Sequence, residues 1–483
     1  MKKLNMKKVT AASLALLMGL SLTACGSSSV SSSQSETSTQ AASDSSSGET
    51  ATTTDTANSG DKTKVLVWSK NSHDLEYMTE KVKEYNLTNT DNIEIEYVVQ
   101  SSSDYLNLIT MSASSGQLPD VFANTTVNLS EFAEAGIIQP LNDMMTDEFK
   151  KVNEVDTHTY EGINALGEEV YWVAGGMRSG SRLIYNVELF KNAGVEIPTT
   201  LTETVDVAKK LTKAGAGVSY GTIFPGLSSP FERWIEHSAE LSGVTPYDYV
   251  NGKYDFTGFK PFIEAVRQMF DDGSVLPGSA SMEIDPTRTQ FAAGNVGFYG
   301  NASQEAGVLT EQFPAENEWS VAQLPTLDGT IKGALSSNPN SGWFMSGTTK
   351  KKEAAWKVIE YFHSEDFLKG YIEGGYTLPI STYMDSIVDK SKMGRLSLFA
   401  LQDYEAVYPQ APTVTPAGET YRDALWNACL SNGPDIDETI ETLNKTYNEA
   451  LDKDVASGKV QRLVIENFDS LHPNDGTITY LDK

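Results

Sequence analysis

The chain has 483 residues with 65 acidic and 37 basic side chains, and its formal net charge is −28. A surface this acidic argues against nucleic acid or anionic lipid as a partner, since both carry negative charge themselves. Two cysteines are too few for a disulfide-stabilised scaffold, so stability must come from a hydrophobic core, and the length suffices for two domains.

The first 25 residues have the order of an export signal. Four lysines within the first eight residues precede an apolar run over 11–22, and small residues lead to Cys25. The apolar run is shorter than the roughly 20 residues that a permanent transmembrane helix needs. The segment 22–26, Leu-Thr-Ala-Cys-Gly, resembles the lipobox of bacterial lipoproteins, in which the cysteine receives a lipid and becomes the new N-terminus. This resemblance implies a signal peptide over 1–24 and a lipid anchor at Cys25 on the outer face of the cell membrane.

Residues 25–62 contain the lipidated cysteine followed by a linker. Between Gly26 and Gly60 serine and threonine dominate and no aromatic residue occurs. A segment that can bury so little apolar surface cannot offset the entropy lost on ordering. We expect it to be disordered and to hold the folded part away from the membrane.

Strands and helices alternate from residue 64 onward. Short apolar or alternating runs predict strands at 64–68, 93–99 and 119–122, and apolar residues at helical spacing predict helices between them. This order implies a mainly parallel sheet covered by helices. Later signals continue the alternation: a helix capped by Asn128, a capping box of Thr200 and Glu203, a strand at 296–299 and a helix at 350–363.

Four stretches carry a family resemblance. The first consists of residues 68–69, 116–121 and 131–141, and the second of residues 184–194 followed by Pro198. The third is residues 291–301. The fourth runs over residues 342–379 and includes Gly342-Trp343, 351–356 and Leu378-Pro379. In order and spacing they resemble the solute-binding lipoproteins of ABC importers, particularly the extracellular family that includes maltose-binding and other carbohydrate-binding proteins. The resemblance covers residues 64–385, which is most of the predicted globular chain.

The resemblance implies a two-lobed α/β fold of the periplasmic-binding-protein type II, with a hinge and an interlobe cleft. The N-lobe would hold residues 63–176 plus 333–388, and the C-lobe residues 177–332 plus 389–483. The protein would capture a small ligand, a mono- or oligosaccharide above all, and deliver it to the permease subunits of an ABC transporter. A monomer is the default state for such a hinged receptor.

Polar residues that follow predicted strands are the first candidates for ligand contacts. Ligands collect beyond the carboxyl ends of parallel strands and between lobes. That rule selects Ser69 to Asn71, Asn124 with Thr125, and Asn301. Their hydroxyl and amide groups are neutral donors and acceptors, which suit a hydroxyl-rich ligand.

Aromatic residues near predicted element ends are the second group of candidates. They are Trp172, Trp234, Tyr299, Trp343 and Tyr376. A flat ring can stack on the C–H face of a sugar, but large aromatic residues are equally often core residues. Trp319 in a predicted strand, Trp356 in an amphipathic helix and Cys429 in an apolar helical stretch are expected to be buried.

Arg178 lies in the loop before the predicted second lobe, where it would contact ligand, act at the hinge, or be an ordinary surface arginine. Two features depart from the family pattern. Ala174-Gly175-Gly176 stands where the family commonly has a proline, and no aromatic residue closely follows Asn301. These departures leave the sugar class and one stacking position open.

The sequence gives little support for a catalytic or metal-binding function. The nucleophile elbow, the Walker loop and the zinc-protease helix motif are absent, and the five histidines lack ligand spacing. We therefore expect no enzyme, no metal and no cofactor. A receptor for a polyamine or metal complex, a surface lipoprotein enzyme acting on glycans, and a receptor serving a sensor kinase remain as alternatives.

Overall fold

The computed structural model describes residues 62–101 and 104–481. The export signal, Cys25 and nearly all of the predicted linker lie outside the described residues. The described residues form one compact unit. No helix in the described part is long and apolar enough to cross a membrane.

A first four-stranded sheet has the order β15-β3-β1-β2. Its strands are β1 (Thr63–Ser69), β2 (Ile93–Val99), β3 (Val121–Ala123) and β15 (Trp343–Met345). Both β2 and β3 pair parallel with β1, as the alternating pattern predicted, and β15 pairs antiparallel with β3. Helices α1 (Leu75–Thr88), α2 (Tyr105–Ser115) and α11 (Lys352–Phe362) each bury an apolar stripe in the same core. The first sheet therefore joins two segments of the chain about 220 residues apart.

A second four-stranded sheet has the order β12-β7-β11-β8. Its strands are β7 (Arg182–Asn186), β8 (Tyr220–Thr222), β11 (Val296–Asn301) and β12 (Trp319–Ala322). Only β8 and β11 pair parallel, because β7 runs antiparallel to both β11 and β12. The expectation of a mainly parallel sheet is thus confirmed for the first sheet and wrong for the second.

One helix beside the second sheet begins with a signal that was read from the sequence. Helix α6 (Leu201–Gly215) has the predicted capping box of Thr200 and Glu203, and α5 (Val187–Ala193) is capped by Asn186. Helices α8 (Lys260–Asp271), α9 (Ile284–Ala292), α14 (Tyr421–Cys429) and α15 (Ile436–Ala456) complete this part. Trp319, Trp356 and Cys429 are buried, as expected.

Shorter elements connect these layers. The helices are α3 (Leu129–Glu134), α4 (Asp147–Val152), α7 (His237–Leu241), α10 (Glu305–Gly307), α12 (Glu365–Glu373) and α13 (Thr382–Ile387), with 3-10 helices η1 (Asn142–Met144), η3 (Thr257–Phe259), η4 (Ser279–Ser281) and η6 (Lys390–Phe399) and π-helices η2 (Phe231–Glu236) and η5 (Val308–Gln312). The paired short strands are β4 (Ala165–Leu166) with β5 (Glu169–Val170), β9 (Tyr247–Asp248) with β10 (Lys253–Tyr254), and β17 (Arg462–Glu466) with β18 (Thr477–Leu481).

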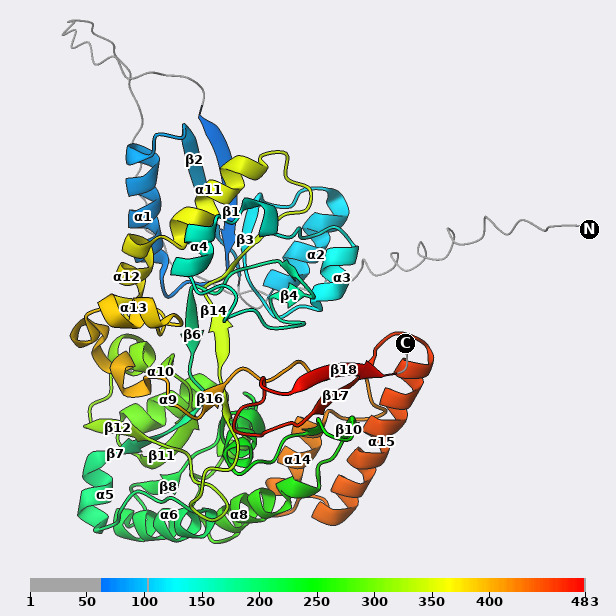
Figure 1. The fold of residues 1–483 in the computed structure, drawn as a ribbon. Helices are drawn as coiled ribbons and strands as arrows, with labels where there is room; N and C mark the ends of the chain where they lie inside the picture. Colours follow the sequence, from blue (N-terminus) through cyan, green and yellow to red (C-terminus); the bar gives the residue numbers. More distant parts are fainter. Residues whose placement is uncertain (1–61, 102–103, 482–483) are drawn as a thin grey trace, which may run out of the picture. The chain divides into compact units, whose positions relative to one another are not determined.

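The chain passes between the two sheets along paired strands. Strand β6 (Gly176–Arg178) precedes β7 of the second sheet, and β14 (Asn338–Asn340) precedes β15 of the first; the two pair antiparallel, with Arg178 opposite Asn338 (Figure 1). Beside them β13 (Leu335–Ser336) pairs parallel with β16 (Glu405–Ala406). We call β6 and β14 the crossing strands. The lobe boundaries predicted from the sequence stay a prediction.

Candidate ligand-binding site

The loop after β1 presents charged side chains at the carboxyl end of that strand. Ser69 is fully buried, and its hydroxyl accepts a hydrogen bond from the backbone N–H of Asn71 at 3.1 Å. Asp74, just before α1, accepts a hydrogen bond from the Tyr371 hydroxyl at 2.6 Å and is also buried. Lys70 and His73 lie between these two fixed points and are partly or fully accessible to solvent. The predicted polar loop is present, and beside the accessible neutral residues Asn71 and Ser72 it carries the cationic Lys70.

Asn124 follows β3 and binds the neighbouring strand connection. Its backbone N–H donates to the carbonyl of Gly342 at 2.9 Å, and its Oδ1 accepts from the Gly342 N–H at 3.2 Å. The side chain is half-buried, and its Nδ2 makes no hydrogen bond to another residue of the described part. This amide therefore keeps a free donor at the carboxyl edge of the first sheet.

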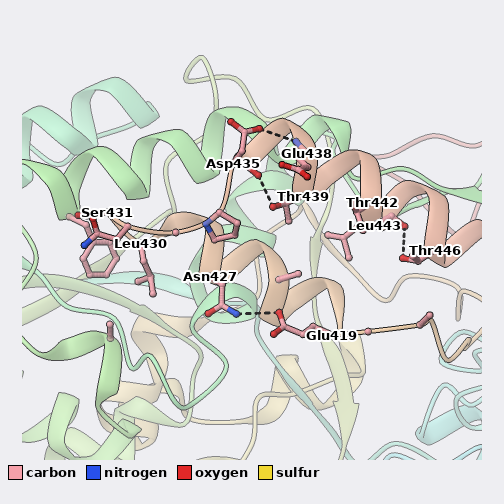
Figure 2. Close-up of a pocket in the computed structure, with 18 residues that line it drawn as sticks. Glu419, Asn427, Leu430, Ser431, Asp435, Glu438, Thr439, Thr442, Leu443 and Thr446 are labelled. Carbon is pink, nitrogen blue, oxygen red and sulfur yellow. Dashed lines mark hydrogen bonds between the residues drawn. The ribbon is translucent and has the colours of Figure 1, made fainter.

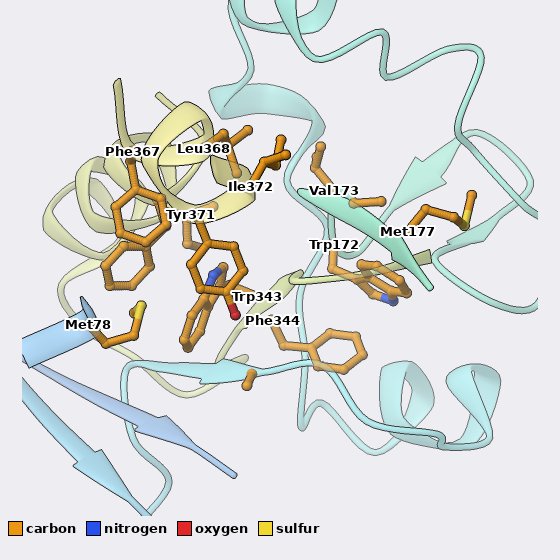
Figure 3. Close-up of a cluster of buried hydrophobic side chains, with 14 of the residues drawn as sticks. Met78, Trp172, Val173, Met177, Trp343, Phe344, Phe367, Leu368, Tyr371 and Ile372 are labelled. Carbon is orange, nitrogen blue, oxygen red and sulfur yellow. The ribbon is translucent and has the colours of Figure 1, made fainter. Parts of the chain in front are cut away.

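Three tryptophans that were candidates for sugar stacking lie in hydrophobic cores. Trp172, Trp234 and Trp343 expose 3%, 2% and 6% of their surface. Figure 3 shows Trp172 and Trp343 in one buried cluster, where the indole N–H of Trp172 donates to the Ile163 carbonyl at 3.0 Å. A Cβ on Gly342 would lie 2.1 Å from the Trp172 ring, so a glycine is needed for this close packing. None of the three presents an open ring face in this structure, and a stacking role for them stays a prediction.

Trp234 belongs to the π-helix η2, which packs against β11. A Cβ on Gly300 would lie 2.5 Å from the Trp234 ring. The indole nitrogen of Trp234 is buried and has no hydrogen-bond partner in the described part. A π-helical turn is a common feature of functional sites, although here its tryptophan faces the core.

Tyr376 is the half-buried member of the aromatic candidates. Its ring centroid lies 5.1 Å from that of Tyr371 and 6.3 Å from that of His73. Tyr299, by contrast, is buried and donates its hydroxyl to Glu305 at 2.7 Å. Tyr376 is thus the aromatic candidate that adjoins the charged loop after β1.

Asn301 lies in a closed polar network at the end of β11. Its Oδ1 accepts from Arg233 at 2.6 Å and from Gln304 at 2.8 Å, and its Nδ2 donates to Glu305 at 2.8 Å. Glu305 in turn binds Arg288. The side chain of Asn301 is fully buried and its hydrogen-bonding groups are used within the protein, so a direct ligand contact stays a prediction.

Arg178, at the end of crossing strand β6, differs from the other candidates because its side chain is exposed to solvent. Despite this access, surrounding protein desolvates the guanidinium and lowers its pKa; Glu232 of η2 and Tyr371 of α12 oppose that shift. Desolvation and the neighbouring charge of Arg178 lower the pKa of Lys70 to about 8. Desolvation also lowers the pKa of His73, where Asp74 opposes and Arg178 reinforces the shift. Lys70, His73, Arg178 and Glu232 therefore gather around the crossing strands, and we call them the Arg178 site.

Buried charges hold the base of the crossing. Arg182 of β7 and Glu405 of β16 form an ion pair in which both side chains are almost wholly buried. Glu240 of α7 accepts hydrogen bonds from the N–H and hydroxyl of Ser336 at 2.9 and 2.8 Å, and burial raises the pKa of Glu240 to about 8. Burial lowers the pKa of His237 to about 3, so it is neutral where its Nδ1 lies 2.8 Å from the Ser181 hydroxyl.

A pocket of about 970 Å³ lies elsewhere, among α8, α14 and α15 (Figure 2). Its lining includes Glu419, Asp435 and Glu438 but none of the candidates selected from the sequence. A ligand there would touch neither crossing strand. In the described part, no group of three or more His, Cys, Asp and Glu side chains is arranged to hold a metal ion.

The sequence reasoning missed the charge of the site. Lys70 lay within a selected segment that was valued for neutral groups, and His73 and Glu232 were not selected. Arg178 itself was selected from its position before the second lobe. The unused signal is the charge of Lys70 inside the selected segment 69–71.

Comparison with known proteins places these features in a family. Residues 69–367 match the model of the bacterial extracellular solute-binding proteins. A putative binding protein of Brucella abortus (strain 2308) is 24% identical over 361 residues, which are 73% of this chain and 84% of that protein. The maltotriose-binding protein of Pyrococcus abyssi is 23% identical over 316 residues, 62% of each chain. An ABC substrate-binding protein of Listeria monocytogenes in complex with cycloalternan is 18% identical with a TM-score of 0.62, covering 81% of this chain and all of that one. These likenesses show a two-lobed α/β fold.

Proposed function

The chain belongs to the bacterial extracellular solute-binding protein family, and we propose that it captures a saccharide between its two lobes and delivers it to an ABC transporter permease. Membership places its action outside the cytoplasm. The observation that carries the proposal is the position of Arg178, an accessible side chain on a crossing strand that is flanked by groups of the first sheet's loop and of η2. A ligand at that position contacts both lobes, and its extra contacts in the closed form shift the hinge equilibrium.

The saccharide assignment is supported by the ligands of relatives. The names of two relatives refer to maltotriose and cycloalternan, both oligosaccharides. Asn124 and Arg178 supply hydrogen-bond donors, and Tyr376 supplies a half-buried ring, which together suit a hydroxyl-rich ligand. A polyamine fits poorly because Lys70 and Arg178 would repel it.

Further parts of the proposal concern the setting of this receptor. We propose that Cys25 carries the lipid anchor, that the protein is a monomer without catalytic activity, and that transport rather than sensing is its role. We further propose Ser69, Asn124 and Arg178 as residues that form or orient ligand contacts. Trp172, Trp234, Asn301 and Trp343 are buried within the protein in this structure, and a ligand contact by them stays a prediction.

The test is a thermal-unfolding screen of residues 26–483 against neutral and acidic saccharides, polyamines, amino acids and metal ions. A ligand at about 100 times its dissociation constant stabilises the fold by about 2.7 kcal/mol. We expect a saccharide to raise the unfolding temperature and to be recovered unaltered by chromatography after long incubation.

Two results would overturn the proposal in different ways. Stabilisation by polyamines or metals alone would contradict the saccharide class while leaving the receptor role. A saccharide that is recovered cleaved would contradict the absence of catalysis.

A separate experiment tests the lipid anchor. The protein is produced in cells with and without Cys25→Ala, and we expect the parent protein to carry a lipid and the variant to carry none.

A further inference from the structure

Among the described residues, Arg178 is the one arginine whose guanidinium forms no hydrogen bond or ion pair with the protein. The sequence contains eight arginines, all within the described residues. The other seven guanidinium groups each donate to a carboxylate, a carbonyl or an amide oxygen of the protein. The guanidinium of Arg178 makes no hydrogen bond or ion pair with any residue in 62–101 or 104–481. Because the side chain is exposed, its planar set of N–H donors is open to an acceptor from outside the protein.

Lys70 adds a second unpaired cation beside it. Its ammonium group forms no ion pair within the described part, and its nearest aromatic contact is the Tyr105 ring at 5.9 Å. The geometry places the two cations in neighbouring segments: Met177, next to Arg178, pairs with Leu378, and the Tyr376 ring lies 6.3 Å from that of His73 in the loop that carries Lys70. The charge of Arg178 accordingly lowers the pKa of Lys70. Neither cation forms an ion pair with a carboxylate of the described part, although acidic side chains outnumber basic ones 65 to 37 in this chain.

We propose that the Arg178 site binds the carboxylate of an acidic saccharide, so that the solute is a uronate-containing oligosaccharide. This inference rests on the proposed function and narrows its ligand class. The guanidinium of Arg178 binds the carboxylate through its planar pair of N–H donors, and Lys70 supplies a second positive charge. Tyr376, beside His73, offers a ring to the sugar next in the chain.

Glu232 is the competing acceptor within the protein. Its carboxylate acts on Arg178 electrostatically but forms its ion pair with Arg422, at 3.4 Å. If Arg178 existed to bind Glu232 as a latch, removing that carboxylate would weaken closure with any ligand. If the site serves a ligand carboxylate, removing Glu232 removes a competitor. The two roles thus predict opposite effects of Glu232→Gln on binding of an acidic saccharide.

The experiment compares matched probes on residues 26–483 by calorimetry and thermal unfolding. The probes are oligomers of galacturonate, glucuronate and mannuronate, each beside its carboxyl-reduced neutral form, together with sugar phosphates. We expect at least one uronate oligomer to bind ten or more times tighter than its reduced form. Arg178→Gln should remove this difference, Arg178→Lys should restore part of it, and Glu232→Gln should increase it. Lys191→Gln, an equal charge change on exposed α5, should leave it unchanged.

The outcomes separate the two proposals. If neutral saccharides bind as tightly as their uronate forms, or if sugar phosphates bind in preference to uronates, the carboxylate assignment is overturned and the saccharide receptor stands. If no saccharide binds, the proposed function fails as well. A uronate preference that persists in Arg178→Gln and equally in Lys70→Gln would place the carboxylate elsewhere and overturn the role of this site.

Discussion

The buried ion pair of Arg182 and Glu405 provides the sharpest test of how the crossing is stabilised. Burial raises the pKa of Glu405 in spite of the opposing charge of Arg182, so desolvation exceeds the attraction within the pair. Arg182 also donates to the carbonyls of Gly180 and Ala400, both at 3.3 Å. Replacing it with methionine, which has a similar length and no charge, leaves a buried carboxylate and the carbonyls of Gly180, Ser181 and Ala400 without this partner.

We expect Arg182→Met to lower the free energy of unfolding by about 3–5 kcal/mol at pH 8, the usual cost of breaking a buried pair from one side. The loss should be smaller at pH 5. A carboxyl whose folded pKa is raised contributes stability that is present below its unfolded pKa and is lost as pH rises through its folded pKa, and removing Arg182 raises that folded pKa further. The double variant Arg182→Met/Glu405→Leu should recover at least half of the loss, because an apolar pair needs no compensation.

Urea unfolding of residues 26–483 at pH 5 and pH 8 measures these differences. Lys260→Met is the control, because it breaks an ion pair between Lys260 and Asp437 at the surface. The two side chains are 39% and 71% exposed, respectively. An exposed pair of this kind contributes little to stability because water screens the two charges. An Arg182→Met variant no less stable than Lys260→Met, or one whose loss is equal at both pH values, would refute the reasoning.

Three further predictions concern the site and its supports. Lys70 has a pKa of about 8, so its ammonium group loses its proton between pH 7 and pH 9. A uronate ligand that needs this ammonium group should bind about fivefold weaker at pH 9 than at pH 8 in calorimetry, with little change between pH 6 and pH 7. An affinity that does not change with pH would contradict the contact between Lys70 and the ligand. Glu240 keeps a proton that the unfolded chain loses near pH 4.5, so native stability should fall as pH rises from about 5 to 8, and Glu240→Gln should flatten that slope in urea unfolding. Gly342→Ala should cost about 1–3 kcal/mol by overpacking against Trp172, whereas Gly307→Ala, which meets no atom within 4 Å, should cost far less in the same assay.

The sequence was informative where the determining contacts are local. The capping box of Thr200 and Glu203 needs only residues three apart, and the alternation in 93–99 needs only its own side chains. The second sheet escaped prediction because the direction of β7 is set by its pairing with β11 and β12, more than 100 residues away. No local pattern states which way a distant strand runs.

The candidate site shows the same limit at the level of single side chains. Trp172 is a core residue because Gly342, 170 positions later in the chain, leaves room for its ring. The side-chain oxygen of Asn301 accepts a hydrogen bond from Arg233 of another element. The sequence could therefore supply the position of a polar or aromatic residue at a strand end, but not whether another segment had already used it. Asn124 accepts a hydrogen bond from Gly342 but remains half-buried, and Tyr376 is half-buried as well, so both stay partly accessible to solvent.

The location of Arg178 ties affinity to movement. A ligand changes a hinge equilibrium only by the difference between its affinities for the two forms. Contacts made by a single lobe are equal in both forms and contribute no such difference. Arg178 stands on a crossing strand, Lys70 follows a strand of the first sheet and Glu232 lies in η2 against the second. A charged ligand group that contacts Arg178 alone would bind without favouring closure. A charged ligand group that also contacts Lys70 favours the form of the protein in which the two cations lie together. The mutual repulsion of the two cations opposes this form until an anion lies between them.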